Sequence, residues 1–441
     1  MRNGIGLGKC RKRRLAGFTP VVGIRLAMAL LVGWLIPYSL SAQTSWVMNS
    51  VTPNGRGVPC VEERGLIHLE ANGTNYDKRF VVRYPEKTSE WNGRLLVGAH
   101  GGTGGLSRSR TGNITDTGET ALDDVIGSNA LDQGYAYASV DRDGIGGTRE
   151  GLALTYAFTE AVRARLQKVF GRTPARTYLA GLSAGGAIVR YAAEDPAPHY
   201  DGALIIAGGG GAAMPQLERQ AQLAVLWPEV DPIKHPDLPL TNPNVKAYAA
   251  AIGTPVEARR LWPFVGSRQS IDGFRKTLEQ LGLKGLSDQQ LRTFKVSSYR
   301  KNTPFMANVT KAQMENTTGK VTMPVLEVVG TFDDIVISGV REYNDRVRTL
   351  SKTAAKPTPA DRHRLYQVEG VWHISVNDDA IGSFQYTMSQ MGLDRKAQDQ
   401  LAEGGTYIPT VQQTFAYLDQ WVSEGKMPPP DQMVKSGEPL K

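Results

Sequence analysis

Cysteine is scarce in this chain of 441 residues, which contains only Cys10 and Cys60. Cys10 falls in an amino-terminal stretch that we expect to be removed, so one thiol would remain in the mature chain. An intramolecular disulfide framework is therefore excluded, and core packing must supply the stability. We expect Cys60 to be a small buried apolar residue, with an intermolecular bridge as the alternative.

The amino-terminal apolar run is also short. It covers 26–36, just before Pro37, and these 11 residues fall well below the about 20 that a helix needs to cross a bilayer. A basic region at 2–25 precedes the run, and the small residues Ser39, Ser41 and Ala42 follow it. This order is typical of a cleaved signal peptide. We therefore predict that residues 1–42 are removed and that the protein is secreted or periplasmic, with no membrane anchor.

Acidic residues are missing from the same stretch. Residues 1–42 contain seven Lys and Arg and no Asp or Glu, so removing them takes the net charge from +8 to +1. A strongly basic chain would favour nucleic acid or an anionic surface as a partner. Here that excess of positive charge belongs to the expected signal peptide, and we predict no nucleic-acid partner.

From about Gly65 onward, short β-rich runs alternate with stretches of helical length. This alternation predicts an α/β fold, with a mostly parallel sheet of eight strands covered by helices on both faces. The turn-rich segment 71–75 joins the first two strands and predicts an antiparallel hairpin at one edge. The expected strands are 66–69, 79–83, 94–98, 135–140, 177–180, 202–207, 325–329 and 364–368.

Residues 212–320 interrupt this alternation, because five prolines crowd 228–243 and helical patches follow. We interpret this segment as an inserted helical lid, which divides the core into parts at 43–211 and 321–441. Aromatic residues of the lid are candidates for lining a substrate pocket, and the alternative is that they form the core of the lid itself. These residues are Trp227, Trp262 and Phe264.

The segment from Gly181 to Gly185 reads Gly-Leu-Ser-Ala-Gly and fits the pattern G-x-S-x-G. Glycines in this pattern permit a tight strand-to-helix turn that holds the serine hydroxyl clear of the backbone. An apolar run at 178–180 leads into the motif, and a helical pattern at 186–193 leaves it. This context predicts a nucleophile elbow in an α/β-hydrolase fold, with Ser183 as the nucleophile. An ordinary serine in a glycine-rich turn is the alternative.

A serine hydroxyl is a weak nucleophile unless a base takes its proton, so a histidine must reach it from the same edge of the sheet. Of the six histidines, only His100 and His373 follow predicted core strands. His373 comes after the last strand and downstream of any acid on the preceding strand, which matches the order Ser, acid, His. We therefore expect His373 to be the base.

The acid should leave the end of the strand before that histidine. The strand at 325–329 is followed by Gly-Thr-Phe-Asp-Asp. We expect Asp333 to hold the imidazole in the right tautomer and to stabilise the imidazolium as it forms. Asp334 remains the alternative, because sequence alone does not distinguish adjacent residues of a loop.

A glycine-rich loop from His100 to Gly105 follows the third predicted strand, where hydrolases of this kind carry N–H donors for an oxyanion. We expect one donor from Ala184 and another from Gly102 or Thr103, with His100 as a candidate substrate contact. A phosphate-cradling loop is the competing interpretation. It is disfavoured because the lysine and Ser/Thr of a nucleotide loop are missing.

With these residues placed, the chain resembles the tannase and feruloyl esterase family over most of its length outside 212–320. The segments that carry the resemblance are Trp91 to Leu95, Gly134 to Ser139, Tyr200 to Ala203, Val368 to His373 and Trp421 to Lys426. The resemblance implies a secreted ester hydrolase with a large lid, often acting on esters of phenolic or related aromatic acids. The family triad maps onto Ser183, Asp333 and His373.

The chain departs from that family beside the triad. The family typically carries a cysteine before the serine and another after the histidine, linked as a disulfide, whereas this chain has Leu182 and Ile374. Two apolar side chains could pack where the bridge would lie, which indicates a divergent branch with its own substrate. The lid also lacks an Asp-rich run like the calcium site of some members. We predict neither a metal nor a cofactor.

Together these features predict a serine carboxylic-ester hydrolase that acts through an acyl-enzyme on a small-molecule or polymeric ester. The alternatives are an extracellular polyester or hydroxyalkanoate depolymerase, for which an exposed aromatic groove would count, and a serine peptidase, for which an acidic amine-binding site would count. A non-catalytic binding protein with a hydrolase fold is a further alternative. It would require at least one triad residue to be misplaced in space.

Overall fold

The computed structural model describes residues 44–51, 59–101, 106–108, 114–116, 118–145, 148–209, 213–262, 270–314, 317–373 and 405–441. Among these residues, ten strands form one sheet and two short strands, β5 (Leu106–Arg108) and β6 (Ile114–Asp116), form another. The large sheet consists of β1 (Thr44–Val51), β2 (Cys60–Ala71), β3 (Thr74–Pro85), β4 (Arg94–Ala99), β7 (Ala136–Val140), β8 (Arg176–Leu182), β9 (Gly202–Ile206), β10 (Val325–Gly330), β11 (His363–Glu369) and β12 (Gln432–Lys435).

All eight expected strands are present, and the large sheet of the described residues has two more than predicted. Both extra strands, β1 and β12, lie at the edges of the sheet. β12 has only four residues and follows a run of prolines, so its sequence offered little of the alternation that identifies a strand. The prediction of eight strands was therefore wrong in number at the edges and correct in the interior.

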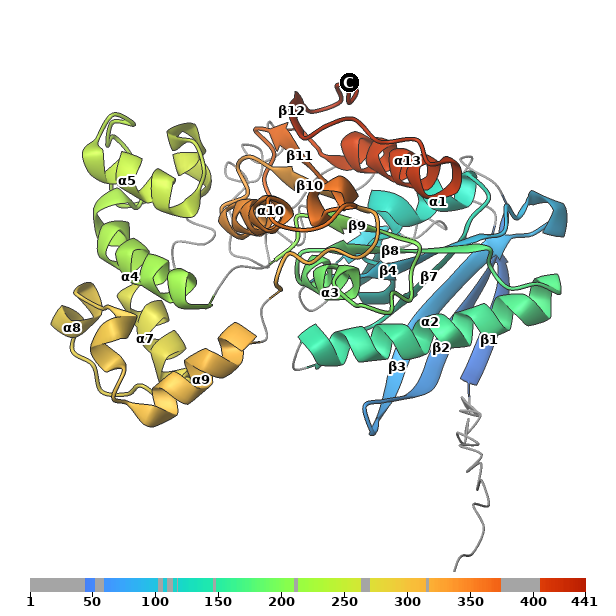
Figure 1. Ribbon diagram of the computed structural model, residues 1–441, viewed down its shortest axis with the longest axis horizontal. Helices are drawn as coiled ribbons and strands as arrows, with labels where there is room; N and C mark the ends of the chain where they lie inside the picture. The colour runs from blue at the N-terminus through green and yellow to red at the C-terminus, as the bar shows by residue number, and fades with distance from the viewer. Residues whose placement is uncertain are drawn as a thin grey trace, which may run out of the picture. The chain divides into compact units, whose positions relative to one another are not determined.

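The strand order is β1-β2-β3-β7-β4-β8-β9-β10-β11-β12, and Figure 1 shows the strands side by side. The pairs from β1 to β7 in this order are antiparallel, and those from β7 to β12 are parallel. The expected hairpin joins β2 and β3 through Asn72 and Gly73, whose φ values of 51° and 73° suit a tight hairpin turn. The carboxyl ends of the parallel strands share one edge, which is where side chains from distant parts of the sequence can meet.

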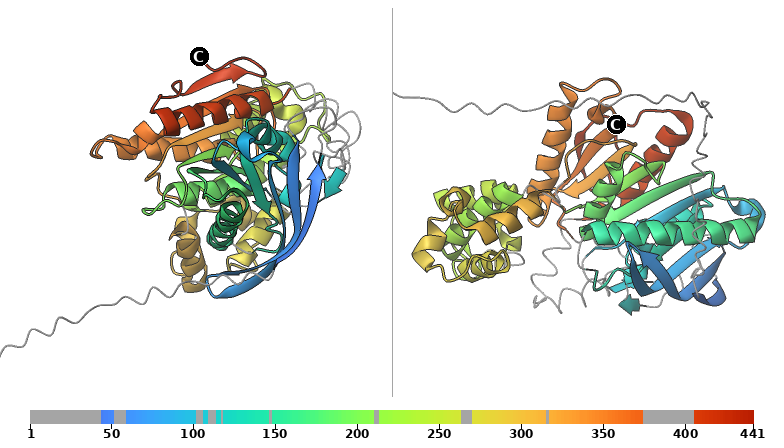
Figure 2. Two further views of the ribbon diagram at one scale, coloured as in Figure 1. Left: turned by 90° about the vertical axis from the view of Figure 1, so that its right-hand side faces the viewer. Right: turned by 60° about the horizontal axis from the view of Figure 1, so that its bottom comes forward.

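Helices cover both faces of the sheet (Figures 1 and 2). One face packs against α2 (Thr148–Phe170) and α3 (Ala184–Ala193), and the other against η3 (Asp123–Gly127), α1 (Ser128–Asp132) and α13 (Ile408–Glu424). Helix α10 (Ile337–Ser351) contributes side chains to both clusters. The chain therefore has a layered α/β architecture with a sheet that is buried on both sides.

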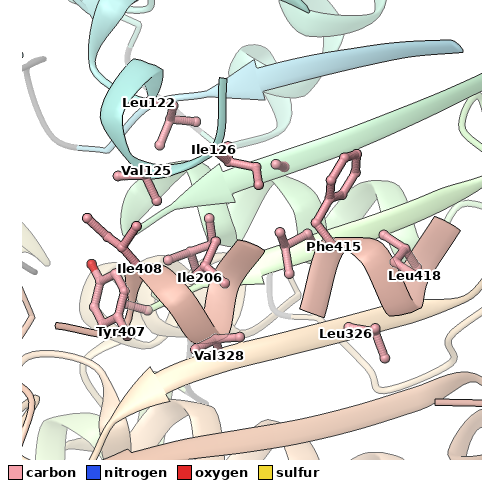
Figure 3. Close-up of a cluster of buried hydrophobic side chains, with 14 of the residues drawn as sticks. Leu122, Val125, Ile126, Ile206, Leu326, Val328, Tyr407, Ile408, Phe415 and Leu418 are labelled. Carbon is pink, nitrogen blue, oxygen red and sulfur yellow. The ribbon is translucent and has the colours of Figure 1, made fainter. Parts of the chain in front are cut away.

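The strand sequences explain why both faces are buried. Successive residues of a strand point to opposite faces, and in β4 Leu95 packs in one cluster while Leu96 packs in the other. Figure 3 shows Ile408, Phe415 and Leu418 of α13 among Ile206, Leu326 and Val328 of the sheet. Full burial of one such side chain stabilises the fold by about 1.5–3 kcal/mol.

Helix α13 also ends where its sequence requires. It covers Ile408–Glu424, with Gly425 as the cap at a φ of 71°. Glycine adopts this left-handed conformation without a Cβ penalty, which makes it the usual residue just past a helix end.

Between β9 and β10, the described residues 213–262 and 270–314 contain helices and no strand. We call these elements the insert helices: α4 (Ala213–Val230), α5 (Pro243–Ile252), η4 (Val256–Leu261), α7 (Ile271–Gln280), α8 (Asp288–Arg292), η5 (Val296–Tyr299) and α9 (Thr303–Met314). They form two hydrophobic clusters of their own, and α4 contributes to both. The domain boundaries drawn from the sequence stay a prediction.

Hydrogen bonds join the insert helices to α10. Arg219 of α4 donates to the hydroxyl of Ser338 at 2.9 Å, and Arg341 of α10 donates to the carbonyl of Gly253, the cap of α5, at 2.6 Å. Arg341 also holds Gln367 of β11 at 3.0–3.1 Å. In the part of the chain that the structure describes, no helix has the length and apolar character needed to cross a membrane.

Candidate active site

Ser183 sits between β8 and α3 in a conformation that few residues adopt. Its φ is 55° and its ψ is −116°, so the backbone turns sharply between strand and helix. Such a conformation costs about 1–3 kcal/mol and persists only where the surroundings enforce it. Here the N–H of Ser183 donates to the carbonyl of Ile206 at 3.0 Å, and the N–H of Gly209 donates to the carbonyl of Ser183 at 2.9 Å. The loop after β9 thus holds the elbow from one side.

The glycines around Ser183 are required by close packing. A Cβ at Gly185 would lie 1.9 Å from the carbonyl oxygen of Ala99, and one at Gly181 would lie 2.4 Å from that of Gly185. A Cβ at Gly101 would lie 2.7 Å from the Cβ of Ser183. Backbone contacts at these distances leave no room for a side chain, so the glycines let three segments of backbone meet at the nucleophile.

A buried ion pair supports the loop after β9. Arg190 of α3 pairs with Glu327 of β10, and both side chains are fully buried. Arg190 also donates to the carbonyls of Gly208 and Gly209. Because the N–H of Gly209 binds Ser183, the pair links the centre of the sheet to the elbow. An isolated buried charge is costly, so the pairing of Arg190 with Glu327 is what allows the two groups to be buried here.

The structure brings Ser183, His373 and Asp333 together at the carboxyl edge of the sheet. Nε2 of His373 lies 2.9 Å from Oγ of Ser183, and Nδ1 of His373 lies 2.8 Å from Oδ2 of Asp333. With the proton on Nδ1, the ring donates to Asp333 and accepts from Ser183. The other oxygen of Asp333 accepts backbone N–H bonds from Ile335 and Val336 at 3.1 and 3.0 Å. His373 therefore lies between Ser183 and Asp333, and backbone N–H groups hold Asp333 in turn.

Burial and the charge of Asp333 shift the pKa of His373 in opposite directions. Burial acts to lower the pKa of His373, but the charge of Asp333 and its hydrogen bond outweigh burial, so the pKa lies above its ordinary value. The imidazole is thus a stronger base than an isolated histidine, which suits a group that must take a proton from a hydroxyl.

The adjacent residue Asp334, our alternative for the acid, has a different partner. Its Oδ1 accepts a hydrogen bond of 2.9 Å from Nε1 of Trp372. Burial raises the pKa of Asp334 to about 8, and the neighbouring charge of Asp333 acts in the same direction. Its carboxyl is therefore mainly protonated at neutral pH, and Asp333 is the carboxylate that contacts the imidazole.

Backbone contacts tie the loop after β10 to the loop after β11. The N–H groups of Thr331 and Phe332 donate to the carbonyls of Val368 and Val371 at 2.9 and 3.0 Å. In addition, the hydroxyl of the buried Tyr407 donates to the carbonyl of His373 at 2.9 Å. These contacts fix the separation between acid and base, which is what a triad requires.

The expected oxyanion donors are only partly described. Ala184 is the first residue of α3 and is exposed, and the first N–H groups of a helix have no partner within it. Its N–H thus belongs to the positive end of the helix, beside Ser183. Gly102 and Thr103 lie outside the described residues. Gly101, which the sequence reasoning did not single out, packs directly on the elbow.

His100 does not have the role that we expected from the sequence. It is fully buried, Nε2 accepts a hydrogen bond from the N–H of Arg142 at 2.7 Å, and Nδ1 lies 3.0 Å from the carbonyl of Gly101. A side chain with no exposed surface and both ring nitrogens engaged cannot contact a substrate. The prediction of a substrate contact at His100 is corrected to a structural role at the start of the glycine loop.

His100, Asp141 and Asp143 form a cluster in which potential metal-ligand atoms lie within 4.8 Å of one another. The lone pair of His100 Nε2 already accepts the N–H of Arg142, and Asp141 accepts a bond from Arg79 at 2.8 Å. Burial acts to raise the pKa of Asp141, but the nearby His100 ring, the backbone N–H of Asp143 and the guanidinium of Arg79 hold it well below its usual range. These residues therefore form a buried polar cluster whose groups already have hydrogen-bond partners within the chain.

Trp227 and Trp262 lie in the core of the insert helices. They are 7% and 0% exposed and pack with Tyr248 of α5, whose ring centroid is 5.7 Å from that of Trp227 and 4.6 Å from that of Trp262. The hypothesis that they line a substrate pocket is therefore corrected in favour of the alternative, a lid core. Phe264 lies outside the described residues, as does Ile374. Leu182 is partly buried and packs against the main core.

Several residues that hold the site had escaped the sequence reasoning. Trp372 and Tyr407 position the loop of His373, and Arg190 and Glu327 support the elbow. The signal for Glu327 was available, because it is a charged residue in the middle of an apolar strand, Val-Leu-Glu-Val-Val. A buried charge in such a strand needs a partner of opposite charge.

One known protein is similar in sequence to part of this chain. No protein-family model matches the chain. Over 158 residues, 33% of the chain, it is 30% identical to the mono(2-hydroxyethyl) terephthalate hydrolase of Piscinibacter sakaiensis. The matched region spans 25% of that relative, so the chain covers about a quarter of its length.

Solved structures of esterases are also similar at low identity. Feruloyl esterase B from Aspergillus oryzae shares 14% identity at a TM-score of 0.46, with 90% of each chain covered. Tannin acyl hydrolase from Aspergillus niger shares 14% identity at a TM-score of 0.45, covering 88% of this chain and 83% of that one. The strand order and the elbow at Ser183 carry the assignment on their own: this chain has the α/β-hydrolase fold.

Proposed function

We propose that this chain is a serine carboxylic-ester hydrolase that works through an acyl-enzyme. The observation that carries the proposal is the hydrogen-bonded series from Ser183 through His373 to Asp333, with distances of 2.9 and 2.8 Å, at the carboxyl edge of the sheet. A non-catalytic binding protein would have no need to keep all three groups in this register on an elbow of strained backbone.

In the first half-reaction, Oγ of Ser183 attacks the ester carbonyl carbon while Nε2 of His373 takes the hydroxyl proton. Asp333 stabilises the resulting imidazolium through its bond to Nδ1 and does not itself take the proton. The tetrahedral intermediate then collapses, and His373 gives its proton to the departing alkoxide. An alcohol leaves, and the acyl group remains bound to Ser183.

In the second half-reaction, water replaces the alcohol. His373 takes a proton from the water as its oxygen attacks the acyl carbon, and it returns the proton to Oγ of Ser183 as the acid leaves. We assign the N–H of Ala184 as one donor to the oxyanion, because it begins α3 next to the nucleophile. The second donor is assigned to Gly102 or Thr103, which follow Gly101 in sequence, the glycine that packs against Ser183.

The proposed substrate is an ester of an aromatic carboxylic acid. Two features support this class: the family resemblance of the segments around the triad, and the partial similarity to a relative named for a terephthalate monoester. Export is proposed from the order of charge and apolarity in residues 1–42, which favours a periplasmic or extracellular enzyme.

The test is a panel of esters assayed with the mature chain and with Ser183→Ala. It runs from short p-nitrophenyl alkanoates to methyl ferulate, methyl gallate, mono(2-hydroxyethyl) terephthalate and a polyester oligomer. Preference for aromatic-acid esters, lost in the variant, is the expected result. Preference for alkanoates or oligomers would retain the mechanism and reject the substrate class. Equal activity in Ser183→Ala would reject the nucleophile.

A further inference from the structure

A second buried carboxyl lies directly beside the proposed acid. Asp334 is 6% exposed, and it accepts the indole N–H of Trp372, which is 2% exposed, at 2.9 Å. Asp334 follows the acid in sequence, and Trp372 precedes the base. Their bond therefore joins the two loops at the level of the triad, yet neither side chain contacts Ser183 in the proposed mechanism.

We propose that Asp334 is a positioning residue for His373: its bond to Trp372 holds the loop after β11 so that the imidazole spans Asp333 and Ser183. This inference rests on the proposed function, because it assigns a role within the same catalytic series. Asp334 acts through Trp372 and not on the substrate.

The order of contacts along the two loops supports this role. The contacts begin at the strand ends, with Thr331 bound to Val368 at 2.9 Å, and continue with Phe332 bound to Val371 at 3.0 Å. The bond between Asp334 and Trp372 extends the series beyond these backbone pairs. Without this bond, the backbone contact between the two loops that lies nearest to His373 is the one at Val371, two residues earlier. A shift of about 1 Å in a catalytic group can cost 10²-fold in rate.

Tyr407 also holds the backbone of His373. The hydroxyl of Tyr407 reaches the carbonyl of His373 at 2.9 Å, and the preceding residue, Trp372, is held by Asp334. A histidine held in this way has little freedom to leave the line between its two partners. The imidazole can therefore keep both hydrogen bonds without help from a bound substrate.

The groups that face Asp334 explain why it can sit beside a carboxylate. Asp333 acts to raise the pKa of Asp334, whereas the indole of Trp372 and the imidazole of His373 act to lower it, and burial outweighs these two. As a neutral acid, Asp334 supplies an acceptor to Trp372 and adds no second negative charge beside Asp333.

Two substitutions separate the acceptor from the charge. Asp334→Asn keeps a neutral acceptor of the same shape, and Asp334→Leu keeps the approximate size but removes the acceptor. On the best ester of the panel at pH 7, we expect Asp334→Asn to keep kcat within about threefold. We expect Asp334→Leu and Trp372→Phe to lower kcat about tenfold to a hundredfold, with KM changed less than about twofold.

A matched control removes a buried hydrogen bond far from the triad. The hydroxyl of Tyr200 bonds to that of Thr159 at 2.8 Å, between α2 and the segment before β9. Tyr200→Phe should lower stability and leave kcat unchanged. This variant shows whether the loss of any buried bond is enough to slow turnover.

A second measurement reports on His373 without turnover. The Nδ1 proton of His373, bonded to Asp333, should give a low-field proton NMR signal in the wild type and in Asp334→Asn. In Asp334→Leu and Trp372→Phe the signal should weaken or move upfield. If one of these two variants fails to fold, the other decides, because each removes one partner of the same bond.

The inference is overturned if folded Asp334→Leu and Trp372→Phe keep the wild-type kcat and the wild-type signal. It is also overturned if Asp334→Asn loses as much activity as Asp334→Leu, because the neutral acceptor would then not be what matters. If the wild type hydrolyses no ester, or if Ser183→Ala is as active as the wild type, the proposed function fails. The NMR signal then still decides whether Asp334 positions His373.

Discussion

The sheet core and the insert helices achieve burial in different ways. In the core, strands that are far apart in sequence place alternating side chains into two clusters, one on each face, and the helices close over them. In the insert, helices that follow one another in sequence form two smaller clusters around α4. The proposed chemistry lies entirely on loops at strand ends of the core. The insert helices therefore supply none of the three triad residues.

The largest difference in activity between the two regions should come from removing the nucleophile. Ser183→Ala should lower kcat about 10⁶-fold on the preferred ester, as is typical when a triad serine is lost. In the insert, Trp262→Phe should leave kcat within a few-fold, because Trp262 packs only with other insert residues in the cluster that contains it. Steady-state kinetics on both variants measure this. A comparable loss in Trp262→Phe would show that the insert takes part in the chemistry.

The next largest effect should come from the acid. Asp333→Asn should lower kcat about 10⁴-fold, because an amide favours the wrong imidazole tautomer. It should also move the midpoint of the rate-against-pH curve to lower pH, since the charge of Asp333 is what holds the pKa of His373 above its ordinary value. The measurement is kcat/KM from pH 5 to pH 9. An unchanged midpoint would mean that Asp333 does not control the base.

Cavity-forming substitutions in the sheet core and in the insert helices should also have different consequences. Phe415→Ala removes a fully buried ring from between α13 and the sheet and should destabilise the core by about 3–5 kcal/mol. Phe274→Ala makes the same change in an insert cluster. We expect the folded Phe274→Ala protein to keep the wild-type kcat, with a change in KM alone. Urea unfolding followed at both regions, together with kinetics, tests this expectation, and equal loss of kcat would contradict it.

The smallest effect should be a dependence of stability on pH at Asp334. Its pKa of about 8 in the folded protein lies above the ordinary value of a carboxyl, so the folded state binds this proton more tightly than the unfolded state. The stability that Asp334 contributes is full below its unfolded pKa and is lost as pH rises toward 8. The melting temperature of Asp334→Asn relative to the wild type should therefore rise between pH 5 and pH 8. A difference that stays constant with pH would show that Asp334 is ionised throughout.

Much of the core followed from the sequence. The eight interior strands and the hairpin at Asn72 were predicted because buried parallel strands are nearly continuous apolar runs and because Asn-Gly favours one turn type. The elbow was predicted because its glycines and its flanking strand and helix occur together. Ser183, Asp333 and His373 each follow a predicted parallel strand, so the sequence predicts that all three lie at the carboxyl edge of the sheet.

Other features depended on contacts that sequence does not encode. Asp333 and Asp334 are neighbours on one loop, and only the positions of His373 and Trp372 distinguish them. His100 has the sequence environment of a site residue, but the N–H of Arg142, 42 residues away, occupies its ring nitrogen. Trp227 and Trp262 illustrate the same limit, because an aromatic residue looks alike in sequence whether it lines a pocket or fills a core.

The close packing at the elbow has a consequence for directed evolution. A Cβ added at Gly181, Gly185 or Gly101 would lie too close to neighbouring backbone or to Ser183. A mutagenic library that randomises these three positions would therefore yield few folded members. Leu182, which is partly buried beside them, is the position in the motif where diversity can be introduced. A search for new activities in this scaffold should therefore vary Leu182 together with the insert helices and leave the glycines untouched.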